Sequence, residues 1–120
     1  LGYGDLGVQG GRDVKTPHLD RLAADGVRLT DFYANHPSCA PSRAALLSGR
    51  YQHRFGFEYN PGPAQHASPA VALPRDVGTL PERLRGLGYA TAAVGKWHIG
   101  FTPENLPTGR GFDGFYGFLD

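Results

Sequence analysis

The single cysteine, Cys39, lies where its side chain could serve as a nucleophile. Pro41 and the apolar residues after it predict a helix through Leu47 that ends at Gly49, so Cys39 falls at the helix N-terminus. Unpaired backbone N–H groups and the positive end of the helix dipole favour an anion there. Arg43, one turn into the helix, adds a planar guanidinium suited to oxyanions. These residues predict a site that stabilises sulfate, phosphate or a thiolate.

A lysine and a histidine form a second group that could do chemistry. Lys96 and His98 follow the apolar segment Ala90–Val94, which is predicted to be a buried strand. Ligands tend to bind at the carboxyl ends of strands in α/β sheets. If strand geometry continues, Lys96 and His98 point to one side and Trp97 to the other. That would pair a cation with an acid/base group, although each residue alone could be a solvated lysine or a core histidine.

The elements that must position these groups are predicted to form an α/β layer. Thr16–Gly26 predicts a helix with one buried face, and the alternating pattern of Val27–Tyr33 predicts a strand. The proline-rich stretch Asn60–Pro74 predicts a long surface loop. Thr79 and Glu82 have capping-box spacing, which predicts a helix with a stripe of leucines, followed by the strand. The segment beyond residue 100 is rich in turn-forming and aromatic residues.

Three segments carry a resemblance to a known family. Residues 39–50 read C-A-P-S-R-A-A-L-L-S-G-R, residues 95–100 read G-K-W-H-I-G, and residues 1–7 read L-G-Y-G-D-L-G. In this order they resemble the motifs of type I, arylsulfatase-like sulfatases, with Ile99 in place of leucine. The resemblance implies the N-terminal portion of the alkaline-phosphatase-like sulfatase fold. Residues 1–120 are then expected to be part of one catalytic domain, truncated at both ends.

The same resemblance implies the roles of four residues. Cys39 would be oxidised to formylglycine, the nucleophile and a ligand of Ca²⁺, with the other metal ligands outside this chain. Arg43 would be needed by the formylglycine-generating enzyme and at the active site. Lys96 would contact sulfate and formylglycine, and His98 the formylglycine hydroxyl. The implied partners are that modifying enzyme and a sulfate-ester substrate, with a sulfated glycan as a candidate.

Composition excludes some classes of partner. The 120 residues include 12 basic and 11 acidic side chains spread along the chain, so no basic stripe could bind nucleic acid. No apolar run approaches the roughly 20 residues that span a bilayer, and no leader-like segment opens the chain. Family resemblance implies export to the periplasm or cell exterior, or to the lysosome in a eukaryote. His36 and His66 lie in polar segments without a partner at metal-ligand spacing and are expected to be solvated.

Two alternative functions remain open. A cysteine-dependent hydrolase would use Cys39 as its thiolate and His98 as the base, and would be blocked by alkylation. A non-catalytic relative would bind sulfated glycans with Cys39 unconverted. A phosphatase would be expected to use serine or threonine instead of Cys39. The 120 residues alone are expected to be inactive, because they would hold only part of the active site.

Overall fold

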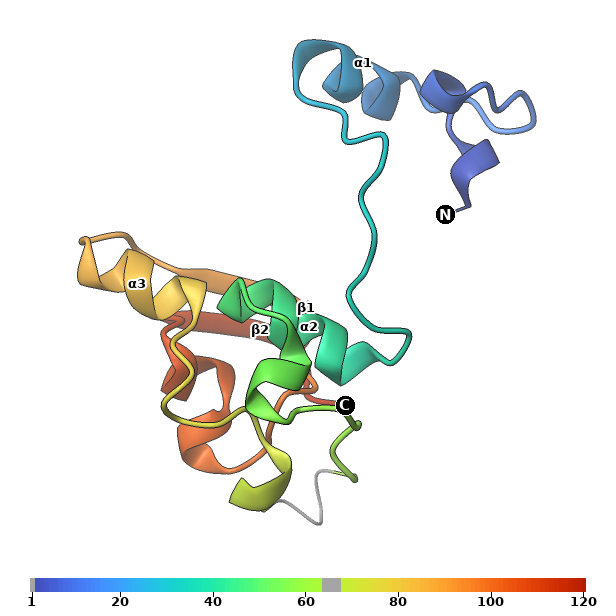
Figure 1. Cartoon of the computed structure of the whole chain (residues 1–120). Helices are drawn as coiled ribbons and strands as arrows, with labels where there is room; N and C mark the ends of the chain where they lie inside the picture. Colours follow the sequence, from blue (N-terminus) through green and yellow to red (C-terminus); the bar gives the residue numbers. More distant parts are fainter. Residues whose placement is uncertain (1, 64–67) are drawn as a thin grey trace. The chain divides into compact units, whose positions relative to one another are not determined.

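The computed structural model describes residues 2–63 and 68–120. They form two compact units, unit 1 over Leu1–Tyr33 and unit 2 over Ala34–Asp120 (Figure 1). Each unit has its own short elements and its own hydrogen bonds.

Unit 1 contains one α-helix and two turns of 3-10 helix. The turns η1 (Tyr3–Asp5) and η2 (Gly7–Gln9) precede α1 (Pro17–Asp25). Thr16 occupies the N-cap position of α1, but its hydroxyl accepts the backbone N–H of Gly7 at 2.9 Å and donates to Asp20 Oδ1 at 3.0 Å. Thr16 therefore links α1 to η2 instead of capping its own helix.

Two expectations for unit 1 are wrong. No residue of α1 is buried, and Leu22 is 69% exposed, so the expected buried face is not covered by the described residues. Residues 27–33 are irregular, and Phe32 and Tyr33 are exposed. A strand needs a neighbour to pair its backbone N–H and C=O groups, and no described residue supplies one to this segment. Its alternating pattern alone could not produce the strand.

The helices of unit 2 follow their local sequence signals. Helix α2 spans Cys39–Ser48 and ends at Gly49, whose φ of 66° is left-handed and whose N–H donates to Ala45 O. The turn η3 (Gln52–Phe55) follows. Helix α3 (Leu80–Gly86) begins with the expected capping box, in which Thr79 and Glu82 each accept the other's backbone N–H. The expected leucine stripe of α3 is not buried, since Leu80 and Leu87 are exposed.

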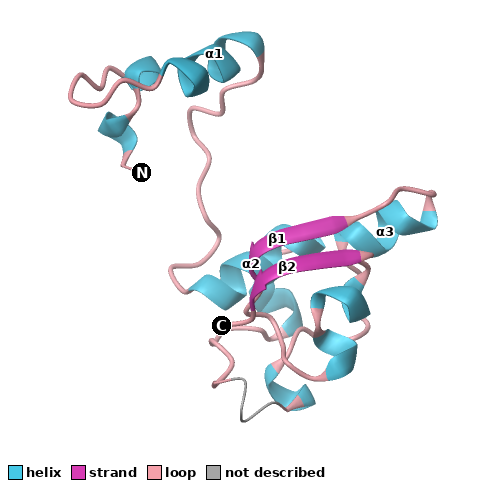
Figure 2. Ribbon diagram, turned by 180° about the vertical axis from the view of Figure 1, so that it is seen from behind, coloured by secondary structure: helices cyan, strands magenta, loops and turns pink. Residues whose placement is uncertain are grey.

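The sheet of unit 2 has two parallel strands, β1 (Ala92–Lys96) and β2 (Gly114–Phe118) (Figure 2). The turns η6 (Pro103–Asn105) and η7 (Pro107–Arg110) lie in the connection between them. Strand β1 begins two residues later than expected. It is also not buried: Val94 is 82% exposed. Strand β2 lies in a segment for which only turns were expected.

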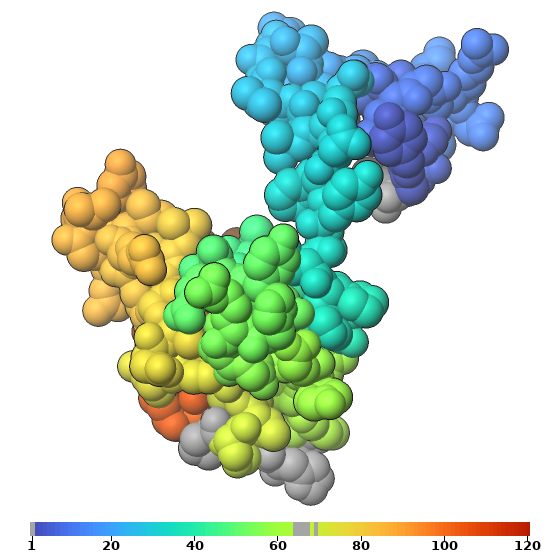
Figure 3. Space-filling model, in the orientation of Figure 1, coloured from blue at the N-terminus to red at the C-terminus, as the bar shows by residue number. Residues whose placement is uncertain are grey.

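The core of unit 2 lies between α2, the sheet and the segment that leads to α3. Its buried members come from four parts of the chain: Ala40, Ala44, Phe57, Leu73, Val77, Trp97 and Ile99. Figures 1 and 2 show α2 over one face of the sheet. Figure 3 shows the green segment of α2 and η3 beside the yellow segment before α3.

The expected surface loop Asn60–Pro74 is only partly confirmed. It is largely irregular, but it contains the turn η5 (Pro69–Val71). Leu73 is 1% exposed and its N–H donates to Ile99 O at 2.9 Å, so the end of the loop belongs to the core. Residues 64–67 of this segment lie outside the described residues.

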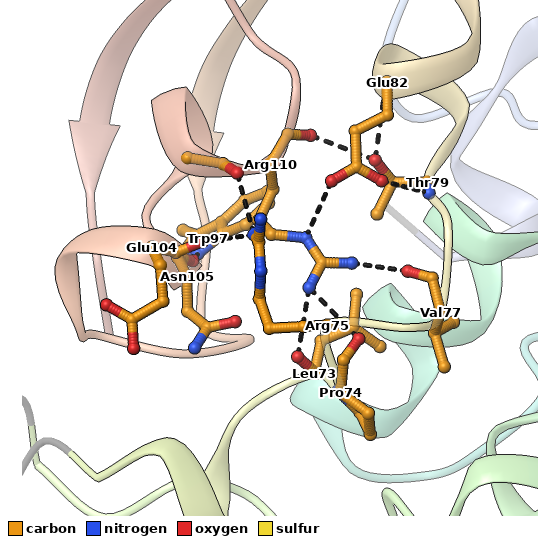
Figure 4. A network of polar contacts seen from close by, with 11 residues as sticks. Leu73, Pro74, Arg75, Val77, Thr79, Glu82, Trp97, Glu104, Asn105 and Arg110 are labelled. Carbon is orange, nitrogen blue, oxygen red and sulfur yellow. Dashed lines mark hydrogen bonds and ion pairs between the residues drawn. The ribbon is translucent and has the colours of Figure 1, made fainter.

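A fully buried arginine, Arg110, links the segment before α3 to the connection between β1 and β2 (Figure 4). The guanidinium of Arg110 donates to three backbone carbonyls, those of Leu73, Pro74 and Val77. Its Nε lies 3.2 Å from Glu82 Oε1, an ion pair without hydrogen-bond geometry. Because peptide oxygens and one carboxylate surround it, the charge can be buried. Arg110 thereby fixes the segment before α3 against the β1–β2 connection.

Gly95 of β1 pairs with Gly117 of β2 in the register of the sheet. A Cβ added at Gly117 would overlap the backbone carbonyl of Gly95, which directly precedes Lys96. We expect Gly117→Ala to lower the free energy of unfolding by about 1–3 kcal/mol. Gly114→Ala is the matched control, because its Cβ would meet only Ala92 Cβ at 4.0 Å. Equal melting temperatures for the two variants in calorimetry would contradict this packing.

Candidate functional site

Cys39 is the first residue of α2 and is partly exposed. The N-cap residue, Ser38, makes no side-chain hydrogen bond to the helix. Instead Asn60, which lies 21 residues after Cys39, accepts the backbone N–H of Ala40 at 3.0 Å and the Cys39 thiol at 3.6 Å. The helix N-terminus therefore faces a long-range partner, which the sequence did not predict.

His98 contacts the cysteine directly. Its Nδ1 lies 3.2 Å from Cys39 Sγ, although 59 residues separate the two in sequence. His98 projects from a turn and not from a continued strand, because β1 ends at Lys96 and His98 has a left-handed φ of 63°. The N–H of Trp97 donates to Phe118 O, and that of His98 to Leu119 O at 2.7 Å. These bonds at the end of β2 hold the turn that directs the imidazole toward α2.

The indole of Trp97 anchors this turn in the core. It is 3% exposed, packs edge-on against Phe112 with ring centroids 6.1 Å apart, and donates from Nε1 to Asn105 O at 2.8 Å. The expected alternation of Lys96, Trp97 and His98 does not apply to this turn, because β1 ends at Lys96 and both Trp97 and His98 are buried. The burial of Trp97 fixes the backbone from which His98 projects.

Arg43 joins α2 to the end of β1. Its Nη1 donates to the backbone carbonyl of Lys96 at 2.8 Å. Its Nε is buried and has no hydrogen-bond partner among the described residues. Arg43 therefore lies beside the Lys96–His98 turn, one helical turn from Cys39, and keeps donor capacity for a further acceptor.

The electrostatics of the site favour a neutral histidine. The pKa of His98 lies below its ordinary value of 6.5, chiefly because burial disfavours the charged ring and then because Lys96 is nearby. Arg43 acts in the same direction, whereas Asp120 and a hydrogen bond to the Pro61 carbonyl oppose it. A neutral imidazole next to position 39 can accept a proton, and the two cations can stabilise an oxyanion.

The described residues do not by themselves form a calcium site. No group of three or more His, Cys, Asp or Glu side chains among residues 2–63 and 68–120 could hold a metal. Ca²⁺ requires six to eight oxygen ligands, whereas the only oxygen with a hydrogen bond to Cys39 in this part of the chain is Asn60 Oδ1. These residues alone therefore do not provide the ligands that the ion requires. Among the same residues no helix is long and apolar enough to cross a membrane.

His36 was expected to be solvated, and this is wrong. Its Nδ1 accepts the N–H of Ser38 at 3.0 Å, and its Nε2 lies 3.8 Å from Glu58 Oε2. It orders the turn that leads into α2. His66 lies outside the described residues.

Comparison with known proteins gives the family. The sulfatase family model matches residues 1–120. The chain is 47% identical to N-acetylgalactosamine-6-sulfatase of Sus scrofa and 50% identical to arylsulfatase A of Bos taurus, covering 98% of this chain and 23% of each relative. It thus spans about a quarter of the length of these proteins.

The structure also matches a crystal structure. The crystal structure of Ps i-CgsB superposes with a TM-score of 0.88 at 44% sequence identity, over 99% of this chain and 26% of that one. The predicted alkaline-phosphatase-like sulfatase fold is confirmed for this portion. Family model, relatives and structure agree, and the chain belongs to the sulfatase family.

Proposed function

We propose that the protein containing this chain is a sulfuric ester hydrolase whose nucleophile is formylglycine derived from Cys39. The observation that carries the proposal is the contact of Cys39 Sγ with His98 Nδ1 at 3.2 Å, at a helix N-terminus that Arg43 joins to Lys96. Family membership supports it. The cysteine is partly exposed, as a reacting group must be.

The residues around position 39 would have separate roles. A hydrated aldehyde there would supply two hydroxyl groups on one carbon. One would attack sulfur and displace the alcohol of the ester, and deprotonation of the other would release sulfate and restore the aldehyde. His98, held neutral, would accept a proton from residue 39. Lys96 and Arg43 would stabilise the negative charge on the sulfate oxygens.

Family membership also supports proposals about the modification, metal site, domain and location of the whole protein. The formylglycine-generating enzyme would convert Cys39, and residues outside this chain would complete a Ca²⁺ site. Residues 1–120 would be part of one catalytic domain, which would cover apolar side chains that this chain leaves exposed, such as Leu22, Phe32 and Val94. Export or delivery to lysosomes is proposed for the whole protein.

A sulfated glycan is the proposed substrate class. One relative is named for N-acetylgalactosamine-6-sulfatase activity, and Ps i-CgsB was crystallised in complex with k-i-k-neocarrahexaose. The test measures inorganic sulfate released from sulfated oligosaccharides and from an aryl sulfate by full-length protein made with the modifying enzyme. Release that survives iodoacetamide supports the proposal, and no release from any sulfate ester contradicts it.

A cysteine-dependent hydrolase is the second candidate, and the Cys39–His98 contact favours it too. A thiol with an imidazole at 3.2 Å is the arrangement such enzymes use. The two candidates differ in their response to alkylation. If iodoacetamide abolishes hydrolysis and modifies Cys39, the thiol is the nucleophile.

The lowered His98 pKa predicts the acid side of the pH profile. His98 should stay neutral below pH 6.5 and gain its proton only as pH falls through its lowered pKa. Removing the charge of Lys96 removes one cause of that lowering. We therefore expect the acid limb of kcat/KM for the residual activity of Lys96→Gln to move to higher pH. Lys96→Arg, which keeps the charge, is the control, and an unmoved limb in Lys96→Gln would contradict this electrostatic account.

A further inference from the structure

We propose that the dipeptide Asn60-Pro61 is a clamp that holds the nucleophile and the histidine in register, with Asn60 as a positioning residue for residue 39. The proposal rests on the proposed sulfatase function. It concerns residues outside the three motifs that identify the family, and it follows from two contacts that adjacent residues make with opposite sides of the site.

The first contact is made by the side chain of Asn60. Its Oδ1 accepts the Ala40 N–H at 3.0 Å and lies 3.6 Å from Cys39 Sγ. An N-cap residue usually supplies such an acceptor, but Ser38 does not. Asn60 thus provides the cap from a distance and, with the same oxygen, restricts the side chain of residue 39.

The second contact is made by the backbone of Pro61. Pro61 is buried, and its carbonyl lies close enough to the His98 imidazole to oppose the lowering of the His98 pKa. His98 Nδ1 faces Cys39, so in the tautomer that carries its proton on Nε2 the lone pair of Nδ1 points toward residue 39. Nδ1 then keeps its lone pair and can accept a proton from residue 39.

Together the two contacts explain how groups 59 residues apart are held at 3.2 Å. Helix α2 carries one group and the turn after β1 carries the other. The side chain of Asn60 contacts the start of α2, and the carbonyl of Pro61 lies near the imidazole of His98. After conversion of Cys39, an oxygen replaces sulfur on Cβ, and the Asn60 amide oxygen remains an acceptor for a hydroxyl group there.

The first test uses full-length, formylglycine-containing protein. For Asn60→Ala we expect unchanged conversion of residue 39 by peptide mass, a kcat about 10- to 100-fold lower, and a KM within about twofold of wild type. Tyr59→Ala, at a neighbouring residue that is 83% exposed, should match wild type. Wild-type kcat in fully converted Asn60→Ala would overturn the clamp and leave the sulfatase proposal intact.

A conservative substitution separates positioning from general structural support. Asn60→Asp keeps an acceptor of the same shape at the start of α2. We expect it to recover much of the kcat lost in Asn60→Ala. A kcat in Asn60→Asp as low as that of Asn60→Ala would contradict the role of the Asn60 oxygen as the acceptor.

The second test does not depend on sulfatase activity. In protein made without the modifying enzyme, loss of the Asn60 acceptor should free the Cys39 thiol and speed its alkylation by iodoacetamide about two- to tenfold. Tyr59→Ala should leave the rate unchanged. Equal rates in Asn60→Ala and wild type would overturn the clamp. Absence of sulfate release from converted wild type would instead defeat the proposed function.

Discussion

Replacing Cys39 with alanine in the full-length protein is expected to abolish sulfate release. Alanine leaves no group on Cβ that could become an aldehyde, so neither attack on sulfur nor expulsion of sulfate can occur. Loss of a nucleophile from an assembled site costs about 10⁴-fold or more in kcat. The measurement is steady-state release of sulfate from a substrate that the wild type cleaves. Residual turnover near the wild-type rate would remove Cys39 from the mechanism.

Cys39→Ser is the matched control for this prediction. Serine keeps a hydroxyl at the same position, against His98 and Asn60, but supplies only one oxygen on Cβ. It could attack sulfur but has no second hydroxyl whose deprotonation would release the sulfate. We expect substrate binding without sustained turnover. Steady multiple turnover by Cys39→Ser would show that the second hydroxyl is unnecessary.

Replacing Arg110 with methionine is expected to destabilise the protein strongly. Methionine approximates the aliphatic part of the side chain but leaves the carbonyls of Leu73 and Val77 without a donor in the core and Glu82 without its ion-pair partner. The Pro74 carbonyl keeps the N–H of Val77 as a donor. Removing one partner of a buried charged group costs about 3–5 kcal/mol. Chemical denaturation of the full-length protein should show this loss as a lower midpoint.

Arg75→Met tests whether burial causes that effect. Arg75 also donates to two backbone carbonyls, those of Glu104 and Gly109, but it is exposed (Figure 4). Water can solvate these carbonyls after the substitution, so the loss should be about 1 kcal/mol or less. Similar losses for Arg75→Met and Arg110→Met would contradict the role assigned to the buried guanidinium.

Local signals in the sequence predicted the elements that they control directly. The Thr79–Glu82 capping box and the glycine at position 49 act within a few residues, and both lie where expected. The placement of Cys39 at the start of α2 depends on the same short-range rules. The contact of Cys39 with His98 was implied by the family resemblance. The local pattern predicted only that Lys96 and His98 share one face of a continued strand, and β1 ends at Lys96. The end of β2 supplies the actual turn.

Features that depend on distant partners could not be predicted from the sequence. Strand β2 requires β1 beside it, and the residues at 27–33 have a strand pattern but no neighbour within the described residues. Asn60 lies in a proline-rich segment whose composition indicates a loop, and nothing local shows that its amide reaches α2. Arg110 reads as an ordinary surface charge until the three carbonyls around it are seen.

The most direct test of the central claim is the mass of the tryptic peptide Leu29–Arg43, which contains Cys39. The peptide should come from full-length protein made in a host that has the formylglycine-generating enzyme. Conversion of the thiol to the aldehyde predicts a loss of about 18 Da, with a partly hydrated form beside it, and no reaction with iodoacetamide. A peptide of unmodified mass that iodoacetamide alkylates would contradict the formylglycine mechanism and favour the thiol hydrolase.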